Sequence, residues 1–110
     1  MNHDLDLKAQ VKQILKVVQE LAPGRSVELR IPPYAAIQCV GGSTHRRGTP
    51  PNVVEMSAET LLKLLENPVK WQQYCDLGSI SASGTNSNLG NLFAEVSKLL
   101  KSEVGSEHGK

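Results

Sequence analysis

The side chains of this chain best suited to covalent or metal chemistry are two cysteines and three histidines, Cys39, Cys75, His3, His45 and His108. A thiol activated by an imidazole is a nucleophile, so Cys39 or Cys75 with His45 is the pair that an enzyme would use. The residues that flank each cysteine match no motif of a thiol enzyme, and the two cysteines form no Cys-x-x-Cys pair. The histidines are scattered and lack metal-ligand spacing. We therefore expect a protein that is not an enzyme and that uses no cofactor or metal.

The densest positive charge is the triplet His45, Arg46 and Arg47, within a segment, residues 41–51, that is rich in glycine and proline. This composition predicts an exposed loop. On such a loop the triplet could contact a lipid carboxylate, a phosphate or an anionic membrane, and form an entrance to a ligand site. The alternative is a solvated charge cluster without a ligand.

Length and composition indicate a single domain. A chain of 110 residues with 39% hydrophobic content can bury one core, covering about 65% of the surface of the unfolded chain. The formal charge of +1 comes from well-mixed residues, so we expect no nucleic-acid partner. The sequence shows neither a secretory signal nor an apolar run long enough to span a bilayer, which predicts a cytoplasmic protein with reduced cysteines.

The first half of the chain predicts one helix and two strands. Apolar residues recur every three or four positions over residues 7–21, which is the pattern of an amphipathic helix. Residues 26–31 alternate between apolar and charged side chains, as in a half-buried strand. Pro32 and Pro33 end that strand, and residues 34–40 resume as a second one. Arg30 and Glu55 are expected on the polar side of the sheet, where they could form a cross-strand ion pair.

The second half predicts a strand, two short helices, a second strand and a closing helix. Residues 52–56 read as a strand, and Ser57 caps the helix that follows. Pro68 begins the next helix, which Gly78 ends before the extended residues 79–84. Residues 89–100 form the last amphipathic helix. We expect the domain to span residues 1–101 and the tail, residues 102–110, to be disordered.

The apolar stripes of these C-terminal helices are candidates for lining a pocket, because small-molecule sites are mostly apolar with few polar groups. The candidate ligand-binding residues are Leu62, Leu65, Trp71, Tyr74, Leu89, Leu92, Phe93 and Val96. The alternative is ordinary core packing, because the first role of such stripes is stability, and a ligand would then use what the core leaves over.

Several of these segments together resemble a known family. Residues 53–65, residues 78–84 and the closing leucine-rich helix resemble the C-terminal half of sterol carrier protein type 2 domains. Residues 32–40 and 45–55 are similar to a small group of stand-alone sterol-carrier-like proteins of high-GC Gram-positive (actinobacterial-type) bacteria. The resemblance implies an α+β fold in which helices cover one face of a small, mostly antiparallel sheet. Before Asn52 the chain shows two strands where the larger family has three.

Two functional hypotheses follow. The resemblance implies a non-catalytic lipid or sterol carrier that holds an acyl chain or another hydrophobic small molecule between the C-terminal helices and the sheet. Transient contact with a membrane or with a partner enzyme would then deliver the ligand. The alternative is a protein-interaction or accessory domain that keeps the fold without a lipid cavity, and the shortened sheet favours it.

Overall fold

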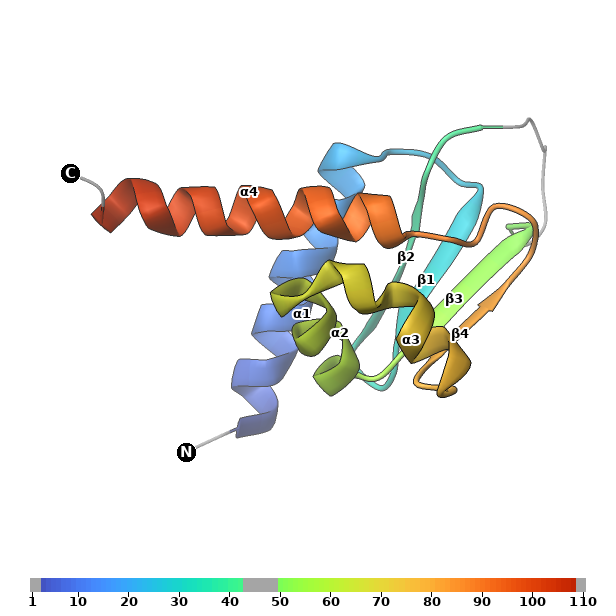
Figure 1. Ribbon diagram of the computed structural model, residues 1–110, viewed down its shortest axis with the longest axis horizontal. Coiled ribbons are helices and arrows are strands. Elements are labelled where there is room, and N and C mark those ends of the chain that lie inside the picture. Colours follow the sequence, from blue (N-terminus) through green and yellow to red (C-terminus); the bar gives the residue numbers. More distant parts are fainter. Residues whose placement is uncertain (1–2, 43–49, 109–110) are drawn as a thin grey trace.

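The computed structural model describes residues 3–42 and 50–108, whose helices and strands share one core (Figure 1). In chain order the elements are α1 (His3–Leu21), β1 (Val27–Ile31), β2 (Ala35–Cys39), β3 (Asn52–Met56), α2 (Ala58–Glu66), the 3-10 turn η1 (Pro68–Lys70), α3 (Trp71–Asp76), β4 (Ile80–Ser83) and α4 (Gly90–His108). The predicted order of elements is confirmed. The fold is α+β, as the sequence predicts.

The four strands form one mixed sheet in the order β2-β1-β3-β4. The pairs β1–β2 and β3–β4 are antiparallel, and the central pair β1–β3 is parallel, with Val27 opposite Asn52. The turn between β1 and β2 contains Pro32 and Pro33, where the amide of Tyr34 donates to the carbonyl of Ile31 (2.8 Å). The mostly antiparallel sheet is therefore confirmed, and the prolines form the turn of a hairpin.

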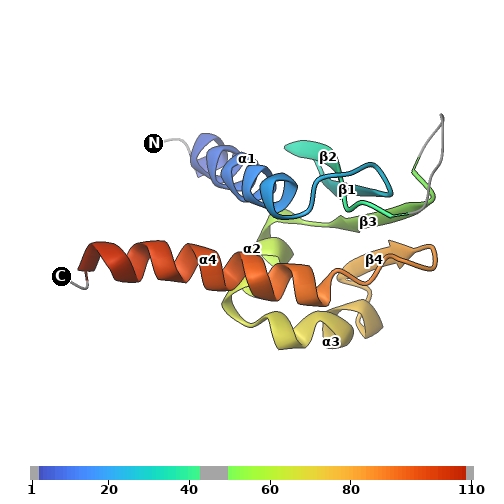
Figure 2. The same ribbon diagram turned by 90° about the horizontal axis from the view of Figure 1, so that it is seen from above.

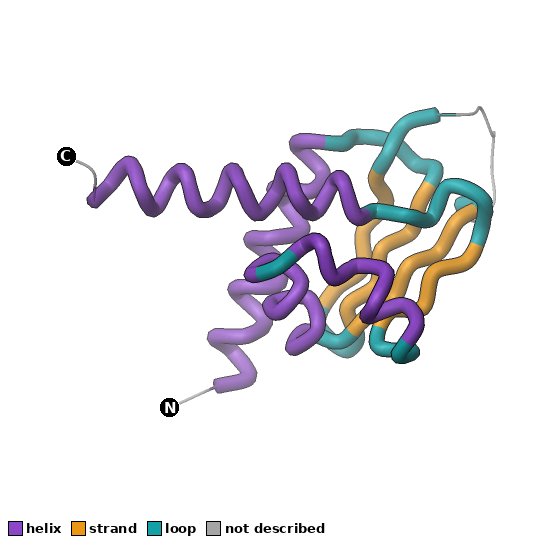
Figure 3. Tube along the Cα trace, viewed as in Figure 1, coloured by secondary structure: helices purple, strands orange, loops and turns teal. Residues whose placement is uncertain are grey.

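Alternation along the strands gives the sheet one apolar and one polar face. Val27, Leu29 and Ile31 of β1 are fully buried, as is Val54 of β3. The helices lie on that side of the strands, as Figures 2 and 3 show. Alternating strands present their apolar residues to one side of the sheet only. Helices therefore need to cover that one face, and the other face can contact water.

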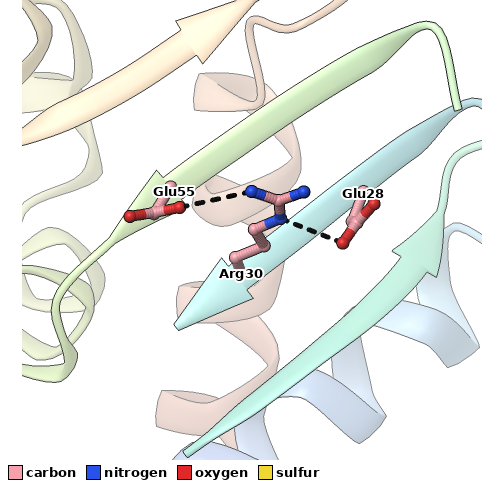
Figure 4. Close-up of polar contacts among 3 residues, drawn as sticks. All are labelled: Glu28, Arg30 and Glu55. Atoms are coloured by element: carbon pink, nitrogen blue, oxygen red, sulfur yellow. Dashed lines mark hydrogen bonds and ion pairs between the residues drawn. The ribbon is translucent and has the colours of Figure 1, made fainter. Parts of the chain in front are cut away.

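The polar face carries the predicted ion pair between Arg30 and Glu55 (Figure 4). Arg30 Nη1 lies 3.7 Å from Glu55 Oε1, and Arg30 Nε lies 2.9 Å from Glu28 Oε2. The two carboxylates raise the pKa of the Arg30 guanidinium, Glu28 more than Glu55. All three side chains are at least partly exposed, so the network is a solvated one that contributes little to stability.

Individual residues mark several of the helix ends. Ser57 caps α2 by accepting a hydrogen bond from the amide of Thr60 (3.1 Å). Pro68 opens the η1 turn, where a missing amide hydrogen costs nothing. Gly78, at φ +81°, takes the left-handed conformation that separates α3 from β4. The start of α2 and the end of α3 are therefore determined by neighbouring residues.

Helix α4 is longer than the sequence predicts. It runs from Gly90 to His108 and extends past α1, away from the sheet (Figure 1). Residues 102–108, the described part of the predicted tail, are the last turns of this helix. Once a helix has begun on a packed face, each added residue costs little, because nucleation is already complete.

The chain crosses itself closely where α1 leads into β1. Val40 has a φ of 67°, which is rare for a β-branched residue. Its amide donates to the carbonyl of Ala22 (2.7 Å) and its carbonyl accepts from the amide of Ser26 (2.9 Å), so two hydrogen bonds hold it in that conformation. A Cβ on Gly24 would collide with the Val40 carbonyl. Glycine is therefore required at this crossing.

Candidate functional site: an apolar groove between three helices

The structure does not bring the eight candidate ligand-binding residues together around one cavity. Phe93 and Val96 are fully buried, and Trp71 is 5% exposed. The rings of Trp71 and Phe93 stack with centroids 6.3 Å apart and planes 21° from parallel. Tyr74 is half-buried against the same core. In this part of the molecule the apolar stripes fill the core.

Trp71 also borders a surface hollow of about 460 Å³, which we call the Trp71 hollow. Its walls come from η1, α3 and the start of α4, and amides make up much of its polar edge. The lining residues are Pro68, Val69, Trp71, Gln72, Asn88, Gly90, Asn91 and Ala94. Val69 is 86% exposed. This hollow is therefore open and about as polar as it is apolar.

Leu89 and Leu92 border a second hollow, of about 560 Å³, where the end of α1 and the end of β2 meet the start of α4. We call it the Val40 hollow, after the residue with positive φ on its wall. Its other lining residues are Ala22, Gly41, Thr85, Asn86 and Asn88. Amide and hydroxyl groups again contribute a large part of the surface, so this hollow has a mixed character too.

Leu62 and Leu65 line the most apolar of these depressions, an open groove of about 420 Å³ between α1, α2 and α4. We call it the three-helix groove. Its lining residues are Ala9, Gln10, Gln13, Ile14, Leu62, Leu65 and Leu100. The volume lies within the range of small-molecule sites, about 300–1,000 Å³, and its surface is almost entirely hydrocarbon. The groove is thus the candidate functional site.

The sequence positions the walls of the three-helix groove by helical spacing. Residues 9, 10, 13 and 14 follow one side of α1, and residues 62 and 65 lie one turn apart on α2. The Ser97 hydroxyl on α4 donates to the carbonyl of Leu65 (2.6 Å), in the last turn of α2. Because Ser97 is buried, this hydrogen bond holds α4 firmly against the end of α2. The groove therefore has defined walls.

Sequence reasoning finds the α2 wall and misses the α1 wall. Leu62 and Leu65 belong to a clear apolar stripe, whereas Ala9, Gln10 and Gln13 are small or polar and fall outside the stripe that docks α1. Periodicity places Leu100 on the last helix but not at a site. No local signal marks these residues as a wall, because alanine and glutamine are ordinary on the exposed side of a helix.

The basic triplet His45, Arg46 and Arg47 lies outside the described residues, so its predicted place at an entrance stays a prediction.

Both cysteines are in surroundings that keep them protonated. Burial raises the pKa of the Cys39 thiol to about 11. The pKa of Cys75 is also raised, first by burial and then by the carboxylate of Asp76. A nucleophilic cysteine needs a lowered pKa and an exposed sulfur, and Cys39 is fully buried. These surroundings weigh against nucleophilic chemistry at either thiol.

The fold and the family comparisons agree on the class of protein. Helices on one face of a small mixed sheet define a sterol-carrier-like domain, as the sequence predicts. Residues 4–94 match the family described as "Bacterial SCP ortholog", and the chain therefore belongs to that family.

Among solved structures, the chain is similar to a protein described as "UbiJ-SCP2 Ubiquinone synthesis protein". The two share 13% sequence identity with a TM-score of 0.51, over 92% of this chain and 96% of that one. At this identity the likeness concerns the fold. No curated protein matches the chain. Within the part of the chain that the structure describes, no helix is long and apolar enough to cross a membrane.

Proposed function

We propose that the protein is a non-catalytic carrier that binds the hydrocarbon part of a lipid, or of another apolar small molecule, in the three-helix groove. The observation that carries this proposal is the nearly pure hydrocarbon lining of a groove of about 420 Å³. Membership of the bacterial SCP ortholog family supports it, because the resemblance to sterol carriers implies ligands of this class.

In the proposed complex, Leu62 and Leu65 contact the ligand from α2, Ile14 from α1 and Leu100 from α4. Phe93 and Val96 support the groove indirectly as part of the core. Binding needs no covalent step. Each methylene removed from water contributes about 0.8 kcal/mol, so lengthening a bound alkyl chain by one methylene strengthens binding about fourfold. This gain ends when the chain is longer than the groove.

The open shape of the groove suits a carrier that must also release its cargo. A ligand in an open groove keeps one side accessible, so a membrane or a partner enzyme could take it up without unfolding of the carrier. We propose that the protein acts in the cytoplasm. Its polar sheet face, with Arg30 between two carboxylates, has no part in this proposal.

The test uses two kinds of measurement on the purified full chain. Mass spectrometry of an organic extract identifies any lipid that co-purifies. Displacement of the uncharged probe N-phenyl-1-naphthylamine by alkanols of increasing length measures saturable binding and its dependence on chain length.

Two tryptophan variants locate the site. Ala9→Trp places an indole in the three-helix groove and is expected to weaken probe binding at least about tenfold, because it occupies the ligand volume. Ala94→Trp adds the same side chain in the Trp71 hollow and is expected to leave binding unchanged. Both positions are exposed, so both variants are expected to fold. Absence of saturable binding by the unaltered chain would refute the proposal. Loss of binding in Ala94→Trp alone would place the ligand in the Trp71 hollow instead of the three-helix groove.

The second candidate is an accessory domain that keeps the fold and acts by binding a partner protein. The packing of Trp71 against Phe93 favours it, because the core beneath the C-terminal helices is filled where an enclosed lipid cavity was expected. Its partner would be a biosynthetic protein, by analogy with the ubiquinone synthesis protein whose fold is similar. An accessory domain would show neither co-purified lipid nor a chain-length series in the displacement experiment.

A further inference from the structure

We propose that the three-helix groove selects apolar ligands whose polar end is uncharged, such as a long-chain alcohol or an acylglycerol, over fatty-acid anions. Gln10 and Gln13 bind that polar end through their carboxamide groups. This inference rests on the proposed function and names the ligand class of the same site.

The polar groups in the groove are all neutral. Among the described residues that line it, Gln10 and Gln13 supply the polar side chains, and the rest are hydrocarbon. The two glutamines are three positions apart on α1, so their side chains are neighbours on one side of the helix. Each carboxamide has donors and an acceptor, which match a hydroxyl or an ester carbonyl.

The two carboxamides are also available. Both side chains are exposed, and neither takes part in a hydrogen bond with another described residue, whereas Gln19 and Gln38 do. A ligand could therefore bind Gln10 and Gln13 without breaking an interaction within the protein. The energetic cost of engaging them is limited to displacing water and ordering two side chains.

Three acidic residues lie one turn beyond the lining residues of α1 and α2. Asp6 precedes Gln10 by one turn on α1, and Glu59 and Glu66 lie one turn either side of Leu62 on α2. Carboxylates also gather where α1 and α2 begin: the pKa of Tyr34 is raised first by burial and then by Asp4 and Glu59. A carboxylate ligand end would meet like charge there.

The described residues that line the groove include no lysine of α1. At about 100° per residue, Lys8 and Lys12 are about 160° around α1 from Gln10, whereas Lys16 is about 60° from Gln13 and Lys12 about 60° from Ala9, each one turn further along the helix. Lys63 and Lys101 are exposed and adjoin Leu62 and Leu100 in sequence, so each points about 100° away from its lining neighbour. A fatty-acid anion bound in the groove would therefore find no charged partner among the lining residues that the structure describes, and an uncompensated charge is costly near hydrocarbon.

The experiment compares three amphiphiles with the same alkyl chain, decanol, decanoate and decylammonium, as competitors of N-phenyl-1-naphthylamine. At mildly alkaline pH decanoic acid is ionised, and we expect decanol to bind at least about tenfold more tightly than decanoate. Decylammonium is expected to bind more weakly than decanol, because the described lining residues supply no carboxylate and Asp6, Glu59 and Glu66 lie a turn beyond them.

A charge placed in the groove should reverse the preference. Gln13→Lys is expected to strengthen decanoate binding at least about tenfold and to weaken decanol binding slightly, because the ammonium pairs with the ligand carboxylate. Gln73→Lys, at an exposed position on α3, adds the same charge outside the groove and is the matched control. The double variant Gln10→Leu/Gln13→Leu is expected to bind decanol no more tightly than decane, because the groove then has no carboxamide for the hydroxyl group.

The outcomes separate this inference from the proposed function. If the unaltered chain binds decanoate or decylammonium as tightly as decanol, the inference is overturned while lipid binding in the groove stands. The inference is equally overturned if Gln73→Lys changes selectivity as much as Gln13→Lys. If none of the three amphiphiles nor the probe binds, the proposed function itself fails.

Discussion

One buried side chain, that of Asn52, joins three separate parts of the chain. Its Nδ2 donates to the carbonyl of Ser26 (2.8 Å), and its Oδ1 accepts from the amide of Asn86 (3.0 Å). A Cβ on Gly84 would collide with the same Oδ1. Asn52, which is 2% exposed, therefore links the start of β1 and the turn after β4 to β3 through hydrogen bonds.

We expect Asn52→Ala to lower the free energy of unfolding by about 2–3 kcal/mol, because a buried carbonyl and a backbone amide lose their partner. Urea denaturation followed by circular dichroism measures the change. Asn91→Ala is the control, since Asn91 is exposed on α4, and its effect is expected to stay within about 0.5 kcal/mol. Equal effects of the two substitutions would show that Asn52 has no special role.

At the scale of elements, the contact between α2 and α4 defines the candidate site. The Ser97 hydroxyl satisfies the Leu65 carbonyl, one of the four that a helix leaves without an internal partner at its C-terminal end. This is a cap supplied by another helix. It fixes the position of α4, and hence that of Leu100, relative to the α2 wall of the three-helix groove.

Ser97→Ala is expected to destabilise the fold by about 1–3 kcal/mol, because the Leu65 carbonyl would stay buried without a donor. It is also expected to weaken binding of N-phenyl-1-naphthylamine, since the α4 wall is then less firmly placed. Chemical denaturation and probe titration measure the two effects. Ser102→Ala lies on the exposed side of α4 and should change neither. An unchanged stability of Ser97→Ala would contradict the importance of this hydrogen bond.

The elements themselves could be predicted because their signals are local. Ser57 caps a helix, Pro32 and Pro33 end a strand, and the alternation of residues 27–31 marks a two-sided strand. The parallel pairing of β1 with β3 has no such signal, because it depends on which strands become neighbours. The positive φ of Val40 is equally hidden, since nothing in a valine favours it.

The candidate site could be predicted only in part, for a related reason. Leu62 and Phe93 belong to similar apolar stripes, yet Leu62 borders the groove and Phe93 is fully buried against Trp71. Periodicity shows which side of a helix avoids water. It does not show whether protein or ligand covers that side, because this depends on the angles at which α1, α2 and α4 meet.

At the scale of the whole molecule, the position of α4 raises the question of where the domain ends. The described groove lining reaches Leu100, and α4 continues to His108. The predicted domain boundary at residue 101 stays a prediction. It implies that residues beyond this point add little to the stability of the folded body.

A chain ending at Ser102 is therefore expected to unfold within about 0.5 kcal/mol of the full chain and to bind the uncharged probe equally well. A chain ending at Glu95 loses buried Val96 and Ser97 together with Leu100, and is expected to be strongly destabilised. Thermal and urea unfolding compare the three chains. A large loss of stability in the chain ending at Ser102 would place the boundary further along α4.

The parallel pairing of the central strands also sets an order of assembly during folding. Three residues, 32–34, separate β1 from β2, whereas twenty residues, 32–51, separate β1 from β3. Closing the longer loop costs about 1.7 kcal/mol more in chain entropy, from the logarithmic dependence on loop length. The hairpin of β1 and β2 therefore forms at the lower entropic cost, and the ladder between β1 and β3 closes after it. Because that ladder joins two antiparallel pairs, its closure is the step at which the two halves of the chain become one cooperative unit.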